Sequence, residues 1–190
     1  AASLAVWDER LAALGATVLR RRLDALEAVI GGVQAFCREV GGGAEHVAWN
    51  YLAGGVTRVD PAAPIGGLRR GLADAVVAAR QDDLDRRTTT VGPHRDEVEV
   101  SIDGRDLRTR ASQGEQRTVA LALRVAAFDL LAERRRSAPL LVLDDVFSEL
   151  DEERRARLVE RLPRGQVFIS TAHREDVPVG GACWEVGPGS

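Results

Sequence analysis

The sequence predicts an α/β protein in which a mainly helical lobe over residues 1–87 precedes a parallel-strand core with a β-hairpin over residues 88–190. Three observations lead to this class. Apolar residues in the first half recur three and four positions apart, the spacing of a helix with one buried face. Asp103-Gly104 separates two β-prone segments, as in a tight hairpin. Two short apolar runs, 140–143 and 166–170, flank a charged helical segment, and this strand–helix–strand order gives two parallel strands.

One apolar stripe runs through residues 1 to about 40 and predicts one long helix or two abutting ones. Gly31-Gly32 lies inside it, and because a glycine costs about 1 kcal/mol within a helix, we expect a break or kink there. Residues 46–52 can form a short strand, and helical spacing returns from 65 to about 86. The stripe of the first helix consists of Leu4, Trp7, Leu11, Leu14, Val18, Leu26, Val29, Ile30, Val33 and Cys37.

The second half begins with a short β-prone stretch, Thr88 to Val91, that Gly92-Pro93 ends. Residues 114–134 predict a helix that is apolar almost all round, which is typical of a buried helix. The run 140–143 is continuously apolar, as expected for a strand buried on both faces of a parallel sheet. A charged helix is expected from about 151 to 162.

The composition limits the classes of partner and the cellular location that the chain can be expected to have. The net charge is only −3, so the chain as a whole gives no electrostatic argument for nucleic acid. Arginine clusters at 20–22, 69–70, 86–87 and 134–136 either neutralise DNA phosphates or are solvated helix faces. The sequence has no apolar run of 18 residues and no N-terminal signal pattern, so neither membrane spanning nor secretion is indicated. We expect a cytoplasmic protein.

Two acidic residues, Asp144 and Asp145, directly follow the apolar run. Open α/β sheets bind their ligands at this end of the strands. In P-loop ATPases an acid at this position holds Mg²⁺, and a second acid can orient or deprotonate the attacking water. The alternative is a strand that ends in a polar turn, and the pair alone does not decide between the two.

A second candidate segment, Ser112 to Glu115, stands at the start of the buried helix. Ser112 is a good N-cap, Gly114 lets backbone N–H groups approach a ligand, and the helix dipole favours an anion there. The same residues form a Ser-x-x-Glu capping box, which explains both ends of the segment without a ligand. A third segment, Phe147 to Asp151, follows the acidic pair, and its acids also suit a helix N-terminus for structural reasons alone.

The order of these motifs is more specific than any one of them. Ser-x-Gly-Glu before a buried helix, then an apolar run with Asp-Asp, then Ser-Glu-Leu-Asp, then a strand ending in Ser170-Thr171, resembles ABC-type ATPase heads. The pieces resemble their signature motif, Walker B motif, D-loop and switch region. Within this class the sequence resembles the RecF family of DNA replication and repair proteins. The matching phrases are VGPHRD at 91–96, SQGEQR at 112–117 and LDDVFSELD at 143–151.

The resemblance implies an ATP-dependent DNA-binding clamp of replication and recombinational repair, in which ATP joins two heads over DNA and hydrolysis releases them. It implies a slow DNA-dependent ATPase with ATP and Mg²⁺ as cofactors. The implied partners are single-stranded or gapped duplex DNA, a second copy of the head, and other recombination-mediator proteins. One alternative is a non-enzymatic dimerisation or partner-binding module that keeps the head fold. A transporter ATPase is disfavoured by the Asp-Asp pair and by a lobe that precedes the signature motif.

The resemblance also implies roles for single residues. Asp144 is the Mg²⁺-site acid, and Asp145 is the catalytic acid that activates water. Ser112 and Gly114 contact the γ-phosphate of a nucleotide held by the partner head. The switch position aligns best with Thr171, although His173 stands two residues later, and the role of His94 stays open. The implied ATP-binding residues are Ser112, Gln113, Gly114, Glu115, Asp151 and Thr171.

The Walker A loop of such heads needs a lysine, and all 26 basic residues of this chain are arginine. The chain also has no methionine. Both features lead us to expect a fragment, the C-terminal half of a head whose N-terminal half carries the phosphate loop. Such a fragment is expected not to hydrolyse ATP alone.

Overall fold

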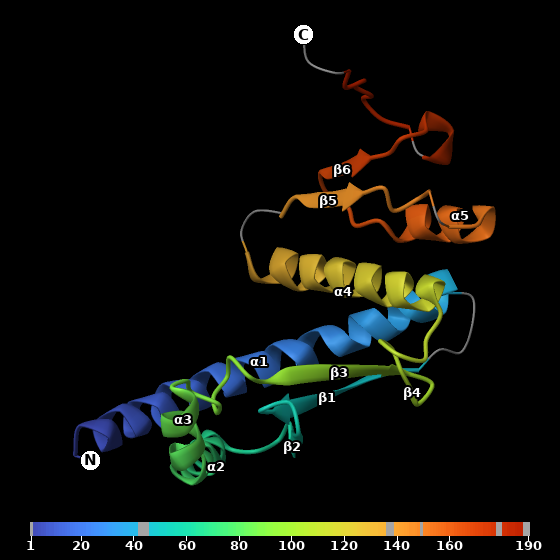
Figure 1. Ribbon diagram of the computed structural model, residues 1–190. Coiled ribbons are helices and arrows are strands. Elements are labelled where there is room, and N and C mark those ends of the chain that lie inside the picture. Colours follow the sequence, from blue (N-terminus) through green and yellow to red (C-terminus); the bar gives the residue numbers. More distant parts are fainter. Residues whose placement is uncertain (1, 42–45, 136–138, 149, 178–179, 188–190) are drawn as a thin grey trace.

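The computed structural model describes residues 2–41, 46–135, 139–148, 150–177 and 180–187. The longest helix, α1 (Ala2–Gly41), lies between a four-stranded antiparallel sheet and helix α4 (Gln113–Arg134), and a pair of parallel strands lies beyond α4 (Figure 1). The other elements are β1 (Val47–Ala53), β2 (Thr57–Val59), α2 (Ile65–Ala78), α3 (Arg80–Arg86), β3 (Glu97–Ile102), β4 (Arg105–Asp106), β5 (Leu141–Asp144), α5 (Glu152–Arg161), β6 (Val167–Ser170) and the 3-10 turn Arg174–Asp176.

Helix α1 is continuous through Gly31-Gly32, so the predicted break is wrong. A Cβ atom at Gly32 would lie 3.1 Å from the Cβ of Ala126 in α4, whereas one at Gly31 would meet open space. Gly32 therefore allows α1 and α4 to approach closely, and the packing gained offsets the helix propensity lost. The C-terminal half of α1 joins α4 and β5 in the largest core cluster through Val33, Phe36, Cys37 and Val40.

The antiparallel sheet has the strand order β2-β1-β3-β4 and includes the predicted hairpin. Asp103 and Gly104 have φ values of 49° and 74°, the left-handed pair that a two-residue hairpin turn requires. Thr88 to Val91 is not a strand, contrary to the sequence pattern. Instead the Asp83 carboxylate accepts hydrogen bonds from the Thr90 N–H (2.8 Å) and hydroxyl (2.5 Å), which hold this stretch as a loop after α3.

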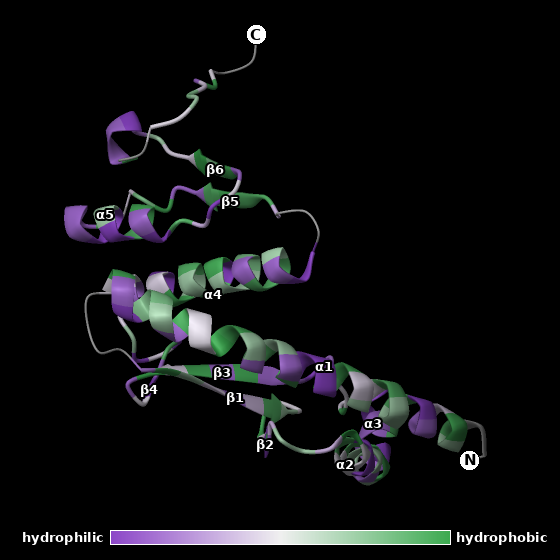
Figure 2. Ribbon diagram, turned by 180° about the vertical axis from the view of Figure 1, so that it is seen from behind, coloured by the Kyte–Doolittle hydropathy of each residue, from purple (hydrophilic) through white to green (hydrophobic). Residues whose placement is uncertain are grey.

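The two apolar runs form β5 and β6, which pair in parallel as predicted, with Asp144 level with Ser170. Both strands are strongly hydrophobic (Figure 2). The expected burial on both faces is wrong, because Leu141 and Leu143 are buried while Leu140 and Val142 are 52% and 57% exposed. Side chains alternate between the faces of a strand, and the described elements cover one face of this two-stranded sheet. Within the described residues, no helix is both long and apolar enough to cross a membrane.

Candidate functional site

The acidic pair lies at the carboxyl edge of the parallel strands. Asp144 is the last residue of β5 and is exposed, and its Oδ1 accepts a hydrogen bond from the hydroxyl of Ser170 at the end of β6. The Asp145 N–H donates to the Ser170 carbonyl at 3.0 Å, which continues the strand pairing by one residue. Parallel pairing thus brings both predicted acids to the end of β6, as the strand order requires.

Asp145 has a left-handed backbone, with φ at 49°. This conformation costs most residues about 1–2 kcal/mol, but Asp and Asn adopt it more readily because their short polar side chains bond locally. Here the Ser148 hydroxyl lies 2.9 Å from Asp145 Oδ2 and 3.0 Å from its carbonyl oxygen. Ser148 therefore holds the carboxylate in a turn that leaves the strand, and such strained turns are frequent at functional sites.

The switch candidates lie in one turn after β6. The Thr171 hydroxyl lies 3.0 Å from the His173 carbonyl oxygen and accepts from the His173 N–H at 3.2 Å. The His173 side chain is exposed. Thr171 follows Ser170 directly, so its backbone lies beside the acidic pair, while the His173 ring extends from the same turn.

The predicted capping box is present at the N-terminus of α4. The Ser112 Oγ accepts from the Glu115 N–H at 3.2 Å, and the Glu115 carboxylate accepts from the Ser112 N–H at 2.6 Å. Among the described residues, the N–H groups of Gln113 and Gly114 have no hydrogen-bond partner. The box and a ligand are therefore compatible, because two donors at the positive end of the helix stay available to an anion.

Glu115 has a further partner that the sequence pattern did not indicate. Its Oε1 accepts from Arg105 Nη2 at 2.6 Å, and its side chain is only 17% exposed. The hydrogen bond from Arg105, followed by that from the Ser112 N–H, lowers the pKa of Glu115 from 4.5 to about 2. Arg105 stands ten residues earlier in the hairpin, so no local spacing connects the two residues.

This pKa shift predicts how Glu115→Gln changes stability with pH. A carboxylate with a lowered pKa stabilises the fold fully above about pH 4.5, and the contribution is lost as pH falls toward about 2. We expect the free energy of unfolding of the wild type to exceed that of the variant by about 1 kcal/mol near pH 7. The difference is small because the Arg105–Glu115 pair is partly solvated. Chemical unfolding from pH 7 to 2.5 measures this difference, and a difference that does not narrow below pH 4.5 would contradict it.

Asp151, which the sequence predicts as the D-loop acid, is the N-cap of α5, and its carboxylate accepts from the Arg154 N–H at 2.8 Å. The Arg154 side chain lies 3.5 Å from the same carboxylate. Arg154 Nη1 also lies 3.4 Å from where a Cβ at Gly114 would be, so the first turns of α4 and α5 are neighbours. Sequence reasoning did not single out Arg154, and Glu149 of the same segment lies outside the described residues.

The 91–96 segment is anchored by a buried polar cluster. Asp96 has a side chain only 3% exposed and accepts from the Tyr51 hydroxyl at 2.8 Å and the Gly54 N–H at 3.0 Å. Burial, opposed by a hydrogen bond from Arg22, raises the pKa of Tyr51. His94 is exposed, with Nε2 3.2 Å from the Thr89 carbonyl oxygen. This motif therefore has a structural function that follows from long-range contacts.

Intramolecular contacts occupy part of the predicted arginine clusters. Arg20 forms an ion pair with Asp24 at 2.8 Å, and Arg22 donates to the Pro93 carbonyl at 2.6 Å. Arg69 pairs with Glu9 at 3.1 Å. These arginines are less available to a phosphate backbone than their spacing indicated. Arg22 and Arg69 are exposed despite these contacts, as are Arg21, Arg70, Arg86, Arg87, Arg134 and Arg135, and Arg136 lies outside the described residues.

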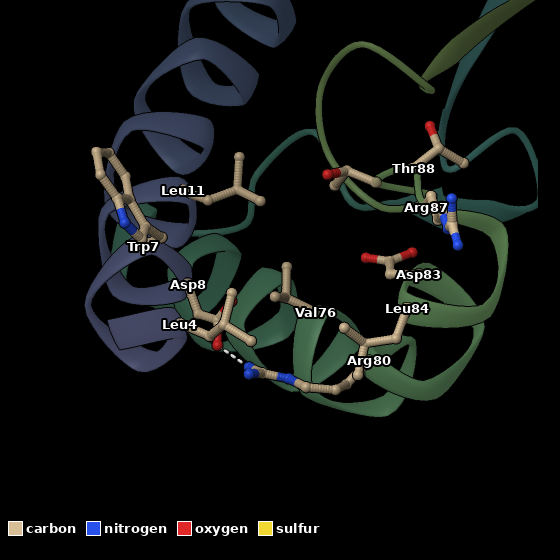
Figure 3. Close-up of a pocket in the computed structure, with 11 residues that line it drawn as sticks. Leu4, Trp7, Asp8, Leu11, Val76, Arg80, Asp83, Leu84, Arg87 and Thr88 are labelled. Carbon is tan, nitrogen blue, oxygen red and sulfur yellow. Dashed lines mark hydrogen bonds and ion pairs between the residues drawn. The ribbon is translucent and has the colours of Figure 1, made fainter. Parts of the chain in front are cut away.

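A separate hollow of about 410 Å³ lies between the N-terminal turns of α1 and the α2–α3 region (Figure 3). Leu4, Trp7 and Leu11 line it from α1, and an ion pair between Asp8 and Arg80 closes one side. The predicted site residues do not line it.

No family model matches the chain. The DNA replication and repair protein RecF of Frankia alni is 42% identical over 181 residues, which are 93% of this chain and 47% of the relative. The chain is a relative of RecF. RecF of Chloroflexus aggregans is 36% identical over 177 residues, 92% of this chain and 45% of that protein.

Two solved RecF structures share the fold. They are described as the recombination mediator protein RecF with ATP and with ATPrS in the RecFOR pathway, and each has a TM-score of 0.76. They are 34% and 33% identical and match 92% of this chain. The predicted α/β class, part of an ABC-type ATPase head with a mainly helical lobe, is thereby confirmed. The chain spans about half the length of the RecF proteins that it matches.

Proposed function

We propose that the chain is the C-terminal half of a RecF-type ATPase, an ATP-dependent DNA-binding clamp of replication and recombinational repair. The observation that carries this proposal is the exposed N-terminus of α4 in a RecF relative. Two unpaired N–H groups there, from Gln113 and Gly114, lie beside the Ser112 hydroxyl. This donor set suits the terminal phosphate of a nucleotide bound by a second head.

In the proposed dimer, Ser112 and Gly114 contact the γ-phosphate of the partner's nucleotide, and Gln113 and Glu115 complete the motif. Because Gly114 has no side chain, the phosphate can approach the backbone. The nearby Arg154 guanidinium adds positive charge to the first turn of α4. Asp151, an exposed residue at the neighbouring helix start, faces the interface.

Asp144 is proposed as the carboxylate of the Mg²⁺ site. Among the described residues, no three His, Cys, Asp or Glu side chains gather into a metal-binding group. Nucleotide-bound Mg²⁺ commonly takes only one or two carboxylates, besides phosphate oxygens and water, so an exposed Asp144 fits. The ion would neutralise phosphate charge, and the Ser170 hydroxyl would orient the Asp144 carboxylate.

Asp145 is proposed as the acid that orients or deprotonates the attacking water, with Thr171 beside it as the switch residue. Ser148 fixes the Asp145 carboxylate, and a positioned base can act on a water within hydrogen-bond reach. The division into a helical lobe at 1–87 and head residues at 88–190, and a cytoplasmic location, belong to the same proposal. The proposed partners are single-stranded or gapped duplex DNA, a second head, and other recombination-mediator proteins.

The 190-residue chain alone is expected to show no ATP hydrolysis above background. It has no lysine, and the phosphate loop of such ATPases needs one to bind the β- and γ-phosphates. Phosphate release with Mg²⁺ and ATP is measured for the chain and for the full-length protein, with a cooperative thermal transition as proof of folding. Robust hydrolysis by the folded chain would contradict the proposal. A full-length protein that dimerises without ATP and never hydrolyses it would favour the non-enzymatic module instead.

A further inference from the structure

The carboxylate of Glu115 joins two parts of the molecule that are separate in the sequence. One oxygen accepts from Arg105 at 2.6 Å and the other from the Ser112 N–H at 2.6 Å. With both oxygens engaged from different sides, the plane of the carboxylate is fixed. The return bond of the capping box, from the Glu115 N–H to the Ser112 hydroxyl, is longer at 3.2 Å. The two shortest hydrogen bonds at this helix start therefore connect Arg105, through the Glu115 carboxylate, with the Ser112 N–H.

The backbone of Arg105 is itself held firmly. It pairs with Ile102, a completely buried residue of β3, directly after the two-residue turn. The turn is anchored at Asp103, whose carboxylate accepts from the His46 N–H at 2.8 Å and whose N–H donates to the His46 carbonyl at 2.9 Å. A side chain extending from such a hairpin starts from a fixed point, so its guanidinium can set the position of another group.

The segment between Arg105 and the helix is compact as well. The Asp106 carboxylate accepts from the Thr109 N–H at 2.7 Å and its hydroxyl at 2.6 Å. The Leu107 N–H donates to the Val100 carbonyl at 2.9 Å. Hairpin, connecting turn and helix start therefore form one hydrogen-bonded unit, with the Arg105–Glu115 pair as its side-chain link.

A contribution to folding stability does not by itself account for the Arg105–Glu115 ion pair. The Arg105 side chain is 44% exposed, and ion pairs of such exposure contribute little to folding. A positioning role fits the geometry better, because a charge-assisted hydrogen bond from a guanidinium to a carboxylate is directional as well as attractive. The group that would be positioned is Ser112, with the two free N–H groups that follow it.

We propose that Arg105 is a positioning residue for the phosphate-binding start of α4: through Glu115 it holds Ser112 and the Gln113 and Gly114 N–H groups aimed at the partner's nucleotide. This inference rests on the proposed function. Arg105 itself need not touch the nucleotide. The antiparallel sheet thereby gains a direct connection to the interface between the two heads.

The test uses the full-length protein with Arg105→Gln, Arg105→Lys and, as a charge-matched control, Arg124→Gln at an exposed position of α4. We expect Arg105→Gln to leave ATP affinity of the monomer within about twofold, while ATP-dependent association of heads, measured by sedimentation, weakens about tenfold or more. Arg105→Lys should restore part of the association, and Arg124→Gln should match the wild type. Unchanged association in a folded Arg105→Gln protein would overturn the proposal.

A double-mutant cycle tests whether Arg105 affects the association of heads through Glu115. If Arg105 acts through Glu115, adding Arg105→Gln to Glu115→Gln should weaken association less than it does in the wild type. Fully additive losses would overturn the role of Glu115 in the link. A Ser112→Arg variant separates this inference from the function on which it rests. Association that survives Ser112→Arg contradicts the proposed function, whereas association lost with Ser112→Arg but kept with Arg105→Gln contradicts only the positioning role.

Discussion

Asp145→Asn in the full-length protein is expected to slow ATP hydrolysis by about 10²–10⁴-fold, the usual contribution of a positioned general base. ATP binding and ATP-dependent association should persist, so that long-lived ATP-bound dimers accumulate. The backbone supports the choice of Asn, because Asp145 has a φ of 49° and Asn tolerates this conformation as well as Asp does. The side chain keeps its shape and an oxygen for the Ser148 hydroxyl while losing its basicity. Single-turnover hydrolysis and sedimentation with ATP measure the two effects.

Asp144→Asn is the matched comparison, one residue earlier on β5. It should weaken the Mg²⁺ dependence of ATP binding, since a neutral amide is a poorer ligand for the ion than a carboxylate. The Mg²⁺ concentration needed for half-maximal binding should therefore rise for Asp144→Asn and stay unchanged for Asp145→Asn. If both variants showed the same modest loss, the separate roles of the two acids would be wrong.

Sequence patterns predicted the features that depend on neighbours along the chain. Ser112 and Glu115 are three residues apart, so their capping box follows from helix geometry and is present. The apolar run before Asp144 and the parallel partner ending at Ser170 follow from strand order, and the hairpin turn from Asp103-Gly104. These features also provide the motif order that resembles the RecF family.

Predictions from the sequence were wrong or incomplete where the structure depends on packing between elements that are distant along the chain. Gly32 looked like a helix break, but Ala126 of α4 approaches so closely that a larger residue would be crowded. Val142 looked buried, but the described elements leave its face of the sheet exposed. Arg105 and Arg154 were not predicted as site residues for the same reason, because their contacts with Glu115 and Gly114 join separate elements.

Ser112→Arg in the full-length protein is expected to abolish ATP-dependent association and hydrolysis together, while ATP binding to each monomer persists. The side chain at this exposed N-cap would fill the space proposed for the partner's γ-phosphate, whereas the nucleotide of the same head would be held by the proposed phosphate loop. Losing the cap should also cost about 0.5–2 kcal/mol of stability, so thermal melting alone cannot separate the two roles of Ser112.

Ser112→Ala makes that separation, because it removes the hydroxyl that accepts from the Glu115 N–H without adding bulk. If Ser112 only caps α4, both variants should melt lower by similar amounts and still associate and hydrolyse ATP normally. If Ser112 faces a phosphate, Ser112→Ala should weaken association moderately through one lost hydrogen bond, about three- to tenfold, and Ser112→Arg should block it. Equilibrium ATP binding, melting and sedimentation with ATP together distinguish these patterns. Normal association by a less stable Ser112→Arg protein would remove the signature-motif assignment, and with it the argument that two heads share the nucleotide.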